Sequence, residues 1–367
     1  MNTAWATAIG IEPSRADCLR VRCRMDGGAE APAVAYPALC GPVAPGDRLL
    51  LNTTALDLGL GTGGVHFVIA NASAPGHRHA GPGHIVKLRY TPLQAAVLSV
   101  EEPDSPWHDA LRDAGTLNGM PVVCCELLSQ VPAVLAGCRY GTPHPRVALV
   151  ITEEAALPVA FSELLAELRA LDAVASVLSA GHAFGGDLEA VNTYSALLAA
   201  RWAVGAEIAI VSPGPGTVGT GTLWGFGGVA QAEAMNATHV LGGRAVGVVR
   251  ASGGDARERH HGISHHTRTV FTRAALGRFA AAWPKGSGDA FAEDWAGLCR
   301  GTQGRMEPFE ISEAPEALDA FAEDGPAYRS MGRGREDDPL FFEAAAAAGL
   351  LARQMLPERT TLEPRDR

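Results

Sequence analysis

Five short apolar runs, each followed by polar residues or a helical pattern, dominate the middle of this chain. The runs lie at 121–128, 146–152, 174–180, 206–212 and 244–250. Continuous apolar runs of this length are typical of strands that are buried on both faces. Helical patterns separate them at 129–138, 157–171, 187–204 and 229–242. This alternation predicts a Rossmann-like, mostly parallel three-layer α/β domain, with helices on both faces of the sheet.

Residues 1–100 have a different pattern. Seven runs of strand character follow one another there, separated by turn sequences such as DGG and APGD, without helical patterns between them. This spacing predicts a small all-β barrel or sandwich. We therefore expect a β domain at 1–100, a linker at 101–119, the α/β domain at 120–275 and a C-terminal extension at 276–367 with a helix at 339–356.

Composition limits the partners that we expect. The net charge of −10 disfavours binding to nucleic acid or to an anionic membrane surface. The seven cysteines include no Cys-x-x-Cys spacing, so neither a disulfide framework nor a zinc ribbon is indicated. The first residues lack the pattern of a secretory signal, and no apolar stretch is long enough for a transmembrane helix. We expect a cytoplasmic protein, and the sequence leaves open whether it forms a homo-oligomer.

The polar and glycine-rich segments of the α/β half follow predicted strands. They are TEEAALP, AGHAFGGD, SPGPGTVGTGT and RASGGDARERHHGISHHT. Ligands of doubly wound α/β domains bind outside the carboxyl ends of the strands, so this rim of the sheet is the predicted site. Within it, Asp187 is expected to be the N-cap of the helix at 187–204, after a turn at Gly185 and Gly186.

A glycine- and threonine-rich loop follows the run at 206–212. Its start fits the dinucleotide pattern GxGxxG, but the next helix begins only near Gly228, so the Rossmann fingerprint is incomplete. No lysine is present to make it a P-loop. The loop is either a cradle for an anionic or polar ligand, or a close-packed loop whose glycines allow positive φ. The ligand-binding candidates are Gly214, Gly216, Thr217, Gly219, Thr220, Gly221, Thr222 and Arg257.

Histidines and carboxylates are concentrated between residues 182 and 266. The candidates for catalysis are His182, Asp187, Asp255, His260, His265 and His266. Such groups suit acid–base catalysis, an anion site completed by neighbouring arginines, or a divalent metal site. The candidates for metal ligands are His182, Asp187, His265 and His266. The spacing matches no established metal motif, and a further alternative is that several of these residues cap helices or face solvent.

Five stretches together resemble a known family. They are GHIVKLRYTPLQ, LNTTALDLGLGTGGVHFV, GHAFGGDLEAVNTYSALLAAR, GPGTVGTGTLWGF and HHGISHHT. Their combination is similar to the bacterial family catalogued as domain of unknown function 3866, and the likeness covers nearly the whole chain. The family carries no assigned activity, so the resemblance implies a shared architecture and adds no catalytic residue.

Two functions are open at this stage. The first is an enzyme, a hydrolase or group transferase rather than an oxidoreductase, that acts on a small anionic ligand such as a phosphorylated compound or a nucleotide. Its cleft would lie between the β domain and the rim of the α/β sheet. The second is a non-catalytic sensor or scaffold that binds a metabolite there. Clustered titratable groups with shifted pKa values would favour the enzyme, and glycine amides without histidine–carboxylate contacts would favour the sensor.

Overall fold

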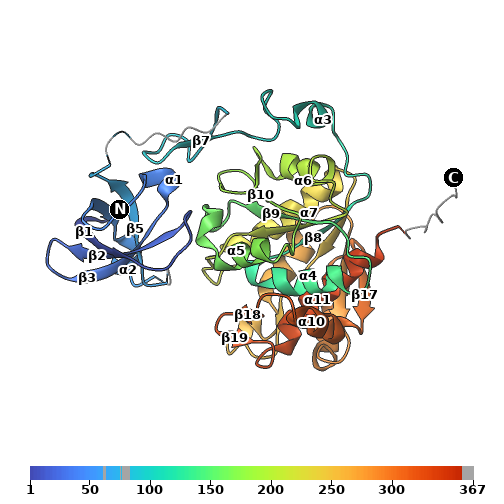
Figure 1. The fold of residues 1–367 in the computed structure, drawn as a ribbon. Coiled ribbons are helices and arrows are strands. Elements are labelled where there is room, and N and C mark those ends of the chain that lie inside the picture. The colour runs from blue at the N-terminus through green and yellow to red at the C-terminus, as the bar shows by residue number, and fades with distance from the viewer. Residues whose placement is uncertain (61–62, 75, 77–82, 358–367) are drawn as a thin grey trace.

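The computed structural model describes residues 1–367 except 61–62, 75, 77–82 and 358–367. It contains a small β barrel, a larger α/β body and a long segment that joins them. Figure 1 shows the barrel beside the α/β body, with the joining segment running along one side of both. The predicted fold class, a β barrel followed by a Rossmann-like domain, is confirmed.

Five strands close the N-terminal barrel in the order β1-β2-β3-β5-β4. β3 and β5 are parallel, whereas the other neighbouring strands pair antiparallel. This is a small Greek-key barrel comparable to the five-stranded OB-fold. Alternate residues, among them Ala6, Ala8, Val21 and Cys23, fill its interior. Its elements are β1 (Thr3–Ile11), β2 (Leu19–Met25), β3 (Glu30–Ala35), α1 (Pro37–Cys40), β4 (Arg48–Asn52), α2 (Thr54–Asp57) and β5 (His66–Asn71).

The α/β body is built on an eight-stranded sheet in which every neighbouring pair is parallel. The strand order is β11-β10-β9-β12-β8-β13-β16-β17. The strands are β8 (Pro121–Cys124), β9 (Val147–Thr152), β10 (Ser176–Ser179), β11 (Leu188–Glu189), β12 (Ile208–Pro213), β13 (Arg244–Gly247), β16 (Phe279–Pro284) and β17 (Met306–Ile311). β9 and β12 are buried along their whole length, which explains their continuous apolar sequences.

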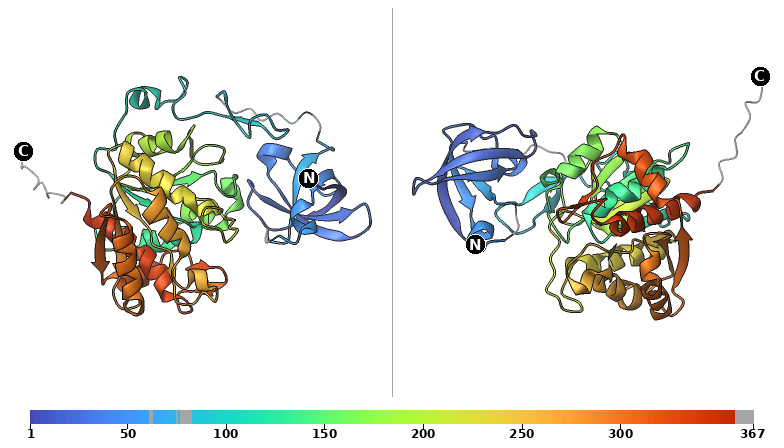
Figure 2. Two further views of the ribbon diagram at one scale, coloured as in Figure 1. Left: turned by 180° about the vertical axis from the view of Figure 1, so that it is seen from behind. Right: turned by 90° about the horizontal axis from the view of Figure 1, so that it is seen from below.

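Helices cover both faces of this sheet, as predicted (Figure 2). One face carries α4 (Val131–Arg139), α5 (Glu163–Ala170), α10 (Ala314–Ala322) and α11 (Pro339–Gln354). The other face carries α6 (Thr193–Trp202), α7 (Ala230–Val240), α8 (His265–Thr269) and α9 (Ala292–Gly301). Among the described residues, none of the helices combines the length and the apolar character needed to cross a membrane.

The sheet extends beyond residue 275, where we expected the α/β domain to end. β16 and β17 complete one edge of the sheet, so the C-terminal extension is an integral part of this body. The sequence of β16, FAAAWP, is rich in alanine, and that of β17, MEPFEI, contains a proline and two glutamates, so neither has a strong strand pattern. The helix expected at 339–356 is present as α11.

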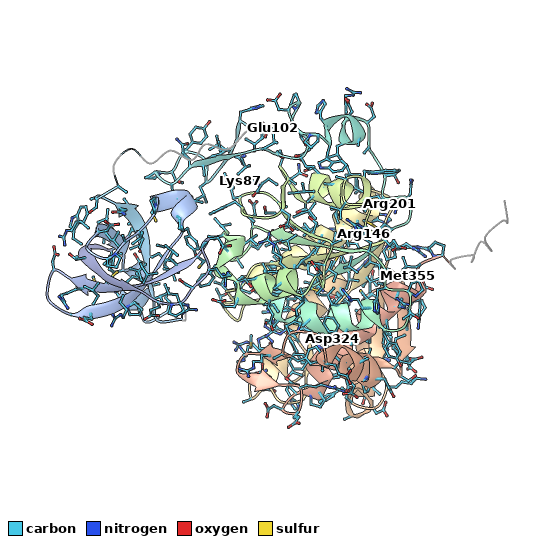
Figure 3. The ribbon with its side chains drawn as sticks, viewed as in Figure 1. Lys87, Glu102, Arg146, Arg201, Asp324 and Met355 are labelled. Carbon is cyan, nitrogen blue, oxygen red and sulfur yellow. The ribbon has the colours of Figure 1, made fainter. Side chains whose placement is uncertain are left out.

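The joining segment contains β6 (Ile85–Lys87), β7 (Ala95–Val97) and α3 (His108–Arg112). β6 and β7 form a separate hairpin outside the barrel, although we expected strands of the β domain there. Lys87 is only 1% exposed and donates hydrogen bonds to the carbonyls of Gly181 and Ala190. Figure 3 shows Lys87 between this segment and the α/β body. A buried ammonium group therefore ties the hairpin to the sheet.

The helix expected at 187–204 begins later than predicted. Asn192 is its N-cap, because its side chain accepts a hydrogen bond from the Ser195 amide. Asp187 precedes β11 instead, where its carboxylate accepts from the Val177 amide and pairs with Arg169. The prediction that Asp187 caps this helix was therefore wrong, since the two glycines before it lead into a strand rather than into a helix.

Two glycines allow α4 and α11 to pack in close contact. A Cβ at Gly137 would lie 2.1 Å from the Ala346 carbonyl oxygen, and a Cβ at Gly349 would lie 2.1 Å from that of Val134. Side chains at these positions would push the two backbones apart. The apolar face that α11 covers would then lose part of its contact.

We predict that Gly349→Ala lowers the free energy of unfolding by roughly 2–3 kcal/mol, because the added methyl group overpacks this helix contact. The matched control is Gly297→Ala in α9, where the only atom near an added Cβ belongs to the Arg300 side chain at 3.9 Å. That change should stabilise the protein by up to about 1 kcal/mol through helix propensity. Urea unfolding of both variants measures the difference, and equal effects would contradict the close helix contact.

Candidate functional site

Three central strands bring their carboxyl ends together at a topological switch point. β8 lies between β12 and β13 in the sheet. The chain leaves β8 towards α4 on one face, but it leaves β12 towards α7 on the opposite face. Adjacent loops that diverge in this way open a crevice, which is where α/β folds bind ligands. The three loops at this crevice are 125–130, 214–229 and 248–264.

Glu126, which follows β8, is buried beneath these loops. Its side chain is fully buried and accepts a hydrogen bond from Arg250 Nη1 at 2.7 Å. The same oxygen, Oε1, lies 2.6 Å from His266 Nδ1. Gln130 fixes the loop by accepting from the Glu126 amide. Gly228 makes room for the carboxylate, because a Cβ there would lie 2.4 Å from Glu126 Cγ.

This contact fixes the tautomer of His266. Arg250 can only donate, and its Nη1 lies 3.2 Å from His266 Nδ1, whereas the Glu126 carboxylate is at 2.6 Å. The Nδ1 proton therefore points to Glu126, and Nε2 keeps a free lone pair. Burial opposes ionisation of Glu126, but Arg250 and His266 outweigh burial and lower the pKa of Glu126. Glu126 is thus a charged, orienting partner of His266.

Two further histidines converge with His266. The ring centroids of His260 and His265 lie 5.0 Å and 4.3 Å from that of His266. Phe226 stacks on His266 with a centroid distance of 3.9 Å and an interplanar angle of 4°. Burial, reinforced by Arg250, lowers the pKa of His260 to about 3, and burial also lowers the pKa of His265. The His260 imidazole is therefore neutral at pH 7.

Ser264 positions two members of this histidine cluster, which consists of His260, His265 and His266. As the N-cap of α8, it accepts from the His266 amide, and its hydroxyl lies 2.8 Å from His260 Nδ1. His261 is not part of the cluster, because its ring packs against Phe291. His260 precedes the two-residue strand β15 (Gly262–Ile263), and His265 and His266 begin α8 shortly after it. This close spacing brings three of the four histidine rings together.

The glycine- and threonine-rich loop folds into a hairpin at 217–227. Thr220 donates its amide to the Gly225 carbonyl, and the Thr222 hydroxyl accepts from the Gly225 amide. These threonines therefore form hydrogen bonds within the hairpin itself. Gly219 borders the histidine cluster, since a Cβ there would lie 3.7 Å from His266 Cε1. Gly214 is packed under the loop, where a Cβ would lie 2.4 Å from the Ala156 carbonyl oxygen.

His182 and Asp187, which we expected to join the other candidates, lie elsewhere. His182 Nδ1 accepts a hydrogen bond from the Leu88 amide, and its Nε2 lies 3.2 Å from Arg89 Nη2. His182 therefore holds the turn of the β6–β7 hairpin. Asp187 binds β10 and Arg169, as described above. The structure brings His260, His265 and His266 together, but not with these two residues.

Asp255 and Arg257 form a network that fixes the loop after β14 (Ala251–Ser252). The Asp255 carboxylate accepts from Arg257 Nε at 2.9 Å and Nη2 at 2.6 Å, and it pairs with Arg333 at 3.4 Å. Arg333 also pairs with Asp338. Hydrogen bonds from Arg257 lower the pKa of Asp255. The network ties this loop to the short hairpin of β18 (Arg329–Ser330) and β19 (Arg333–Gly334).

A cavity of about 820 Å³ lies between the barrel and the α/β body. The barrel contributes Tyr36 and Phe67, and the rim of the sheet contributes Phe161 and Phe184. This mostly apolar lining and this size are typical of a small-molecule site. Val218 also lines the cavity, and the next residue, Gly219, borders His266. One strand of the 217–227 hairpin thus separates the cavity from the histidine cluster.

A family model described as "Protein of unknown function (DUF3866)" matches residues 32–349. This chain belongs to that family. The match begins in β3 and ends in α11, so it includes the sheet and the whole histidine cluster. The resemblance seen in the sequence is confirmed. No curated protein and no solved structure matches the chain.

Sequence reasoning missed Glu126 and Arg250. Glu126 falls inside the run 121–128 that we expected to be strand, but β8 ends at Cys124. Arg250 likewise falls at the end of the run 244–250, whereas β13 ends at Gly247. A charged residue at the end of a buried apolar run was the available signal. Such a residue marks the point where the chain leaves the sheet, because a lone charge is costly within it.

We predict that Asp255→Asn lowers the free energy of unfolding at pH 7 by roughly 1.5–3 kcal/mol, because it removes charge-assisted hydrogen bonds. The folded-state pKa of Asp255 is below the ordinary value of about 3.9. The wild-type advantage is therefore present above pH 4 and is lost as pH falls below it. Urea unfolding at pH 7, 5 and 3.5 measures this trend. Asp104→Asn, at an exposed carboxylate, is the control, and a constant difference across pH would contradict the network.

Proposed function

We propose that this protein is a hydrolase or group transferase whose catalytic centre is the histidine cluster at the switch point. The Glu126–His266 contact carries the proposal. A buried carboxylate that holds one imidazole nitrogen leaves the other nitrogen free to activate a nucleophile, which is the logic of a catalytic dyad. A sensor that only binds a metabolite does not require a buried carboxylate–histidine pair.

The substrate that we propose is a small anionic compound. Burial is the main cause of the lowered pKa values of His260 and His265. The positive charges of Arg250, Arg257 and Arg259 add to it, so three arginines lie near the cluster. This local charge is opposite in sign to the net charge of −10 and favours an anionic group at the histidines. The adjoining cavity has room for the less polar part of the molecule. Phosphorylated compounds and nucleotides meet both requirements.

Each residue of the proposed centre has a role that its contacts support. Arg250 keeps Glu126 ionised, and Glu126 holds the Nδ1 proton of His266. Phe226 covers one face of the His266 ring, which limits its rotation and excludes water from that side. The incomplete dinucleotide fingerprint and the use of the hairpin threonines within their own turn favour hydrolysis or group transfer over hydride transfer.

We predict that Glu126→Gln and His266→Gln each lower kcat/KM by about 10²- to 10⁴-fold, because the nucleophile loses its oriented imidazole. The assay measures turnover of chromogenic phosphomonoester, phosphodiester and carboxylic ester substrates by the full-length protein. His261→Gln is the matched control, since its ring lies against Phe291 outside the cluster. Circular dichroism shows whether each variant is folded. Loss of activity in the control to the same degree, or no turnover of any substrate class by wild type, would refute the proposal.

A further inference from the structure

We propose that His260, His265 and His266 bind one divalent metal ion of the zinc type and leave one coordination position open for water or substrate. The metal site coincides with the proposed catalytic centre, and its catalytic meaning rests on that proposed function. Three histidines with an open fourth position are a ligand set of catalytic zinc sites. The set differs from the one expected from the sequence, because it includes His260 and excludes His182 and Asp187.

The three rings are close enough to share one ion. One ring nitrogen from each histidine lies within 4.8 Å of those of the other two. Nitrogens around a tetrahedral zinc ion, with bonds of about 2.0–2.1 Å, are separated by roughly 3.3 Å. Small side-chain rotations close the remaining difference. The cluster is thus nearly preorganised, since the ring centroids already lie 4.3–5.2 Å apart.

Two of the proposed ligands are oriented by a contact to Nδ1, the ring nitrogen that would not bind the metal. His266 Nδ1 is held by the Glu126 carboxylate, and His260 Nδ1 lies 2.8 Å from the Ser264 hydroxyl. In both residues Nε2 is therefore the nitrogen available to a metal. A carboxylate or hydroxyl that binds the outer nitrogen of a ligating histidine fixes its tautomer and raises its basicity. A general base would need one such histidine, and this arrangement supplies two beside a third ring.

The third ligand supplies an independent observation. His265 Nε2 is buried, and it has no hydrogen-bond partner among the residues that the structure describes. A buried polar nitrogen without a partner costs free energy, so a ligand that binds this nitrogen would stabilise the folded protein. A metal ion at the centre of the cluster satisfies this nitrogen. No amide or hydroxyl in the described part of the chain does so.

The ligand chemistry selects the class of metal. Imidazole nitrogens suit Zn²⁺, Co²⁺, Ni²⁺ and Cu²⁺, whereas Mg²⁺ and Ca²⁺ prefer oxygen ligands. The Glu126 carboxylate binds Arg250 and His266 through Oε1, and its Oε2 has no hydrogen-bond partner among the described residues. When bound, such a metal would supply an activated water as the nucleophile, in place of the direct activation by His266 proposed above. His266 then holds the metal, and Glu126 acts as a positioning residue.

The test is zinc binding by the full-length, tag-free protein after treatment with a chelator. The protein is incubated separately with Zn²⁺, Co²⁺ and Mg²⁺, desalted and analysed for metal content, and the absorption of bound Co²⁺ reports four-coordination. We expect about one Zn²⁺ per chain, none of the Mg²⁺, and a loss of zinc affinity of at least about 100-fold in His265→Ala. Glu126→Gln should weaken zinc binding by about 10- to 100-fold, because it removes support from His266.

Two controls separate this ligand set from the alternatives. His261→Ala changes the same histidine-rich segment outside the cluster, and His182→Ala changes the residue expected from the sequence, so both should bind zinc like wild type. If His265→Ala does not fold, His260→Gln replaces it. Failure of the wild type to retain zinc, or unchanged affinity in the folded His265 or His260 variant, overturns the metal site.

The metal site and the proposed function can fail separately. Turnover that persists in the chelator-treated protein, is not raised by added zinc and still requires His266, refutes the metal site and leaves the acid–base enzyme. Stoichiometric zinc binding without turnover of any ester class refutes the proposed function and supports the metal site. Zinc-dependent turnover that is lost in His265→Ala supports both.

Discussion

The buried carboxylate of Glu126 is the interaction on which this end of the sheet depends. A fully buried charge is costly without a partner, so Glu126 requires both Arg250 and His266. These partners come from the loop after β13 and from α8, and the carboxylate therefore locks segments that are far apart in the chain. Gly228, from the loop after β12, is needed for the carboxylate to fit. The positions of the three loops therefore depend on one another through this carboxylate.

The same constraint explains the neighbouring hairpin. Phe226 stacks on His266, and Gly219 lies beside the same ring, so the base of the 217–227 hairpin is fixed by the histidine. The tip is not fixed in this way, since Leu223 is 46% and Trp224 is 52% exposed. Adjacent exposed apolar side chains are typical of surfaces that contact a ligand or partner. The hairpin therefore lies between the apolar cavity and the histidine cluster.

Much of the architecture could be predicted from sequence, because its causes are local. β9 and β12 are buried on both faces, and their continuous apolar sequences show this directly. β16 and β17 were missed because alanine, proline and glutamate give weak patterns, and only the pairing of β16 with β13 and of β17 with β16 makes them strands. The β6–β7 hairpin has strand character, but its position depends on contacts between residues that are about a hundred positions apart in the sequence. Lys87 binds Gly181, and His182 binds Leu88.

The sequence predicted the position of the candidate site, but it predicted only some of the residues that form it. The strand-end rule led to His260, His265 and His266, since all three follow β13. It also included His182 and Asp187, because sequence alone does not show that β10 is three strands away from β8. Glu126 and Arg250 were missed since a strand end is uncertain by two or three residues, and the two residues lie within that margin. Strand order and exact strand ends are properties of the whole sheet.

The contact between α4 and α11 has a consequence for biosynthesis. α4 ends at Arg139 and α11 begins at Pro339, so about 200 residues must be added before the apolar surface of α4 meets its partner. At roughly 5–20 residues per second, this surface waits some 10–40 seconds on the ribosome. The barrel, whose strands all lie before residue 72, can close long before. The newly made chain therefore carries a folded N-terminal domain and an incomplete sheet, whose exposed apolar face is the part that needs protection from aggregation.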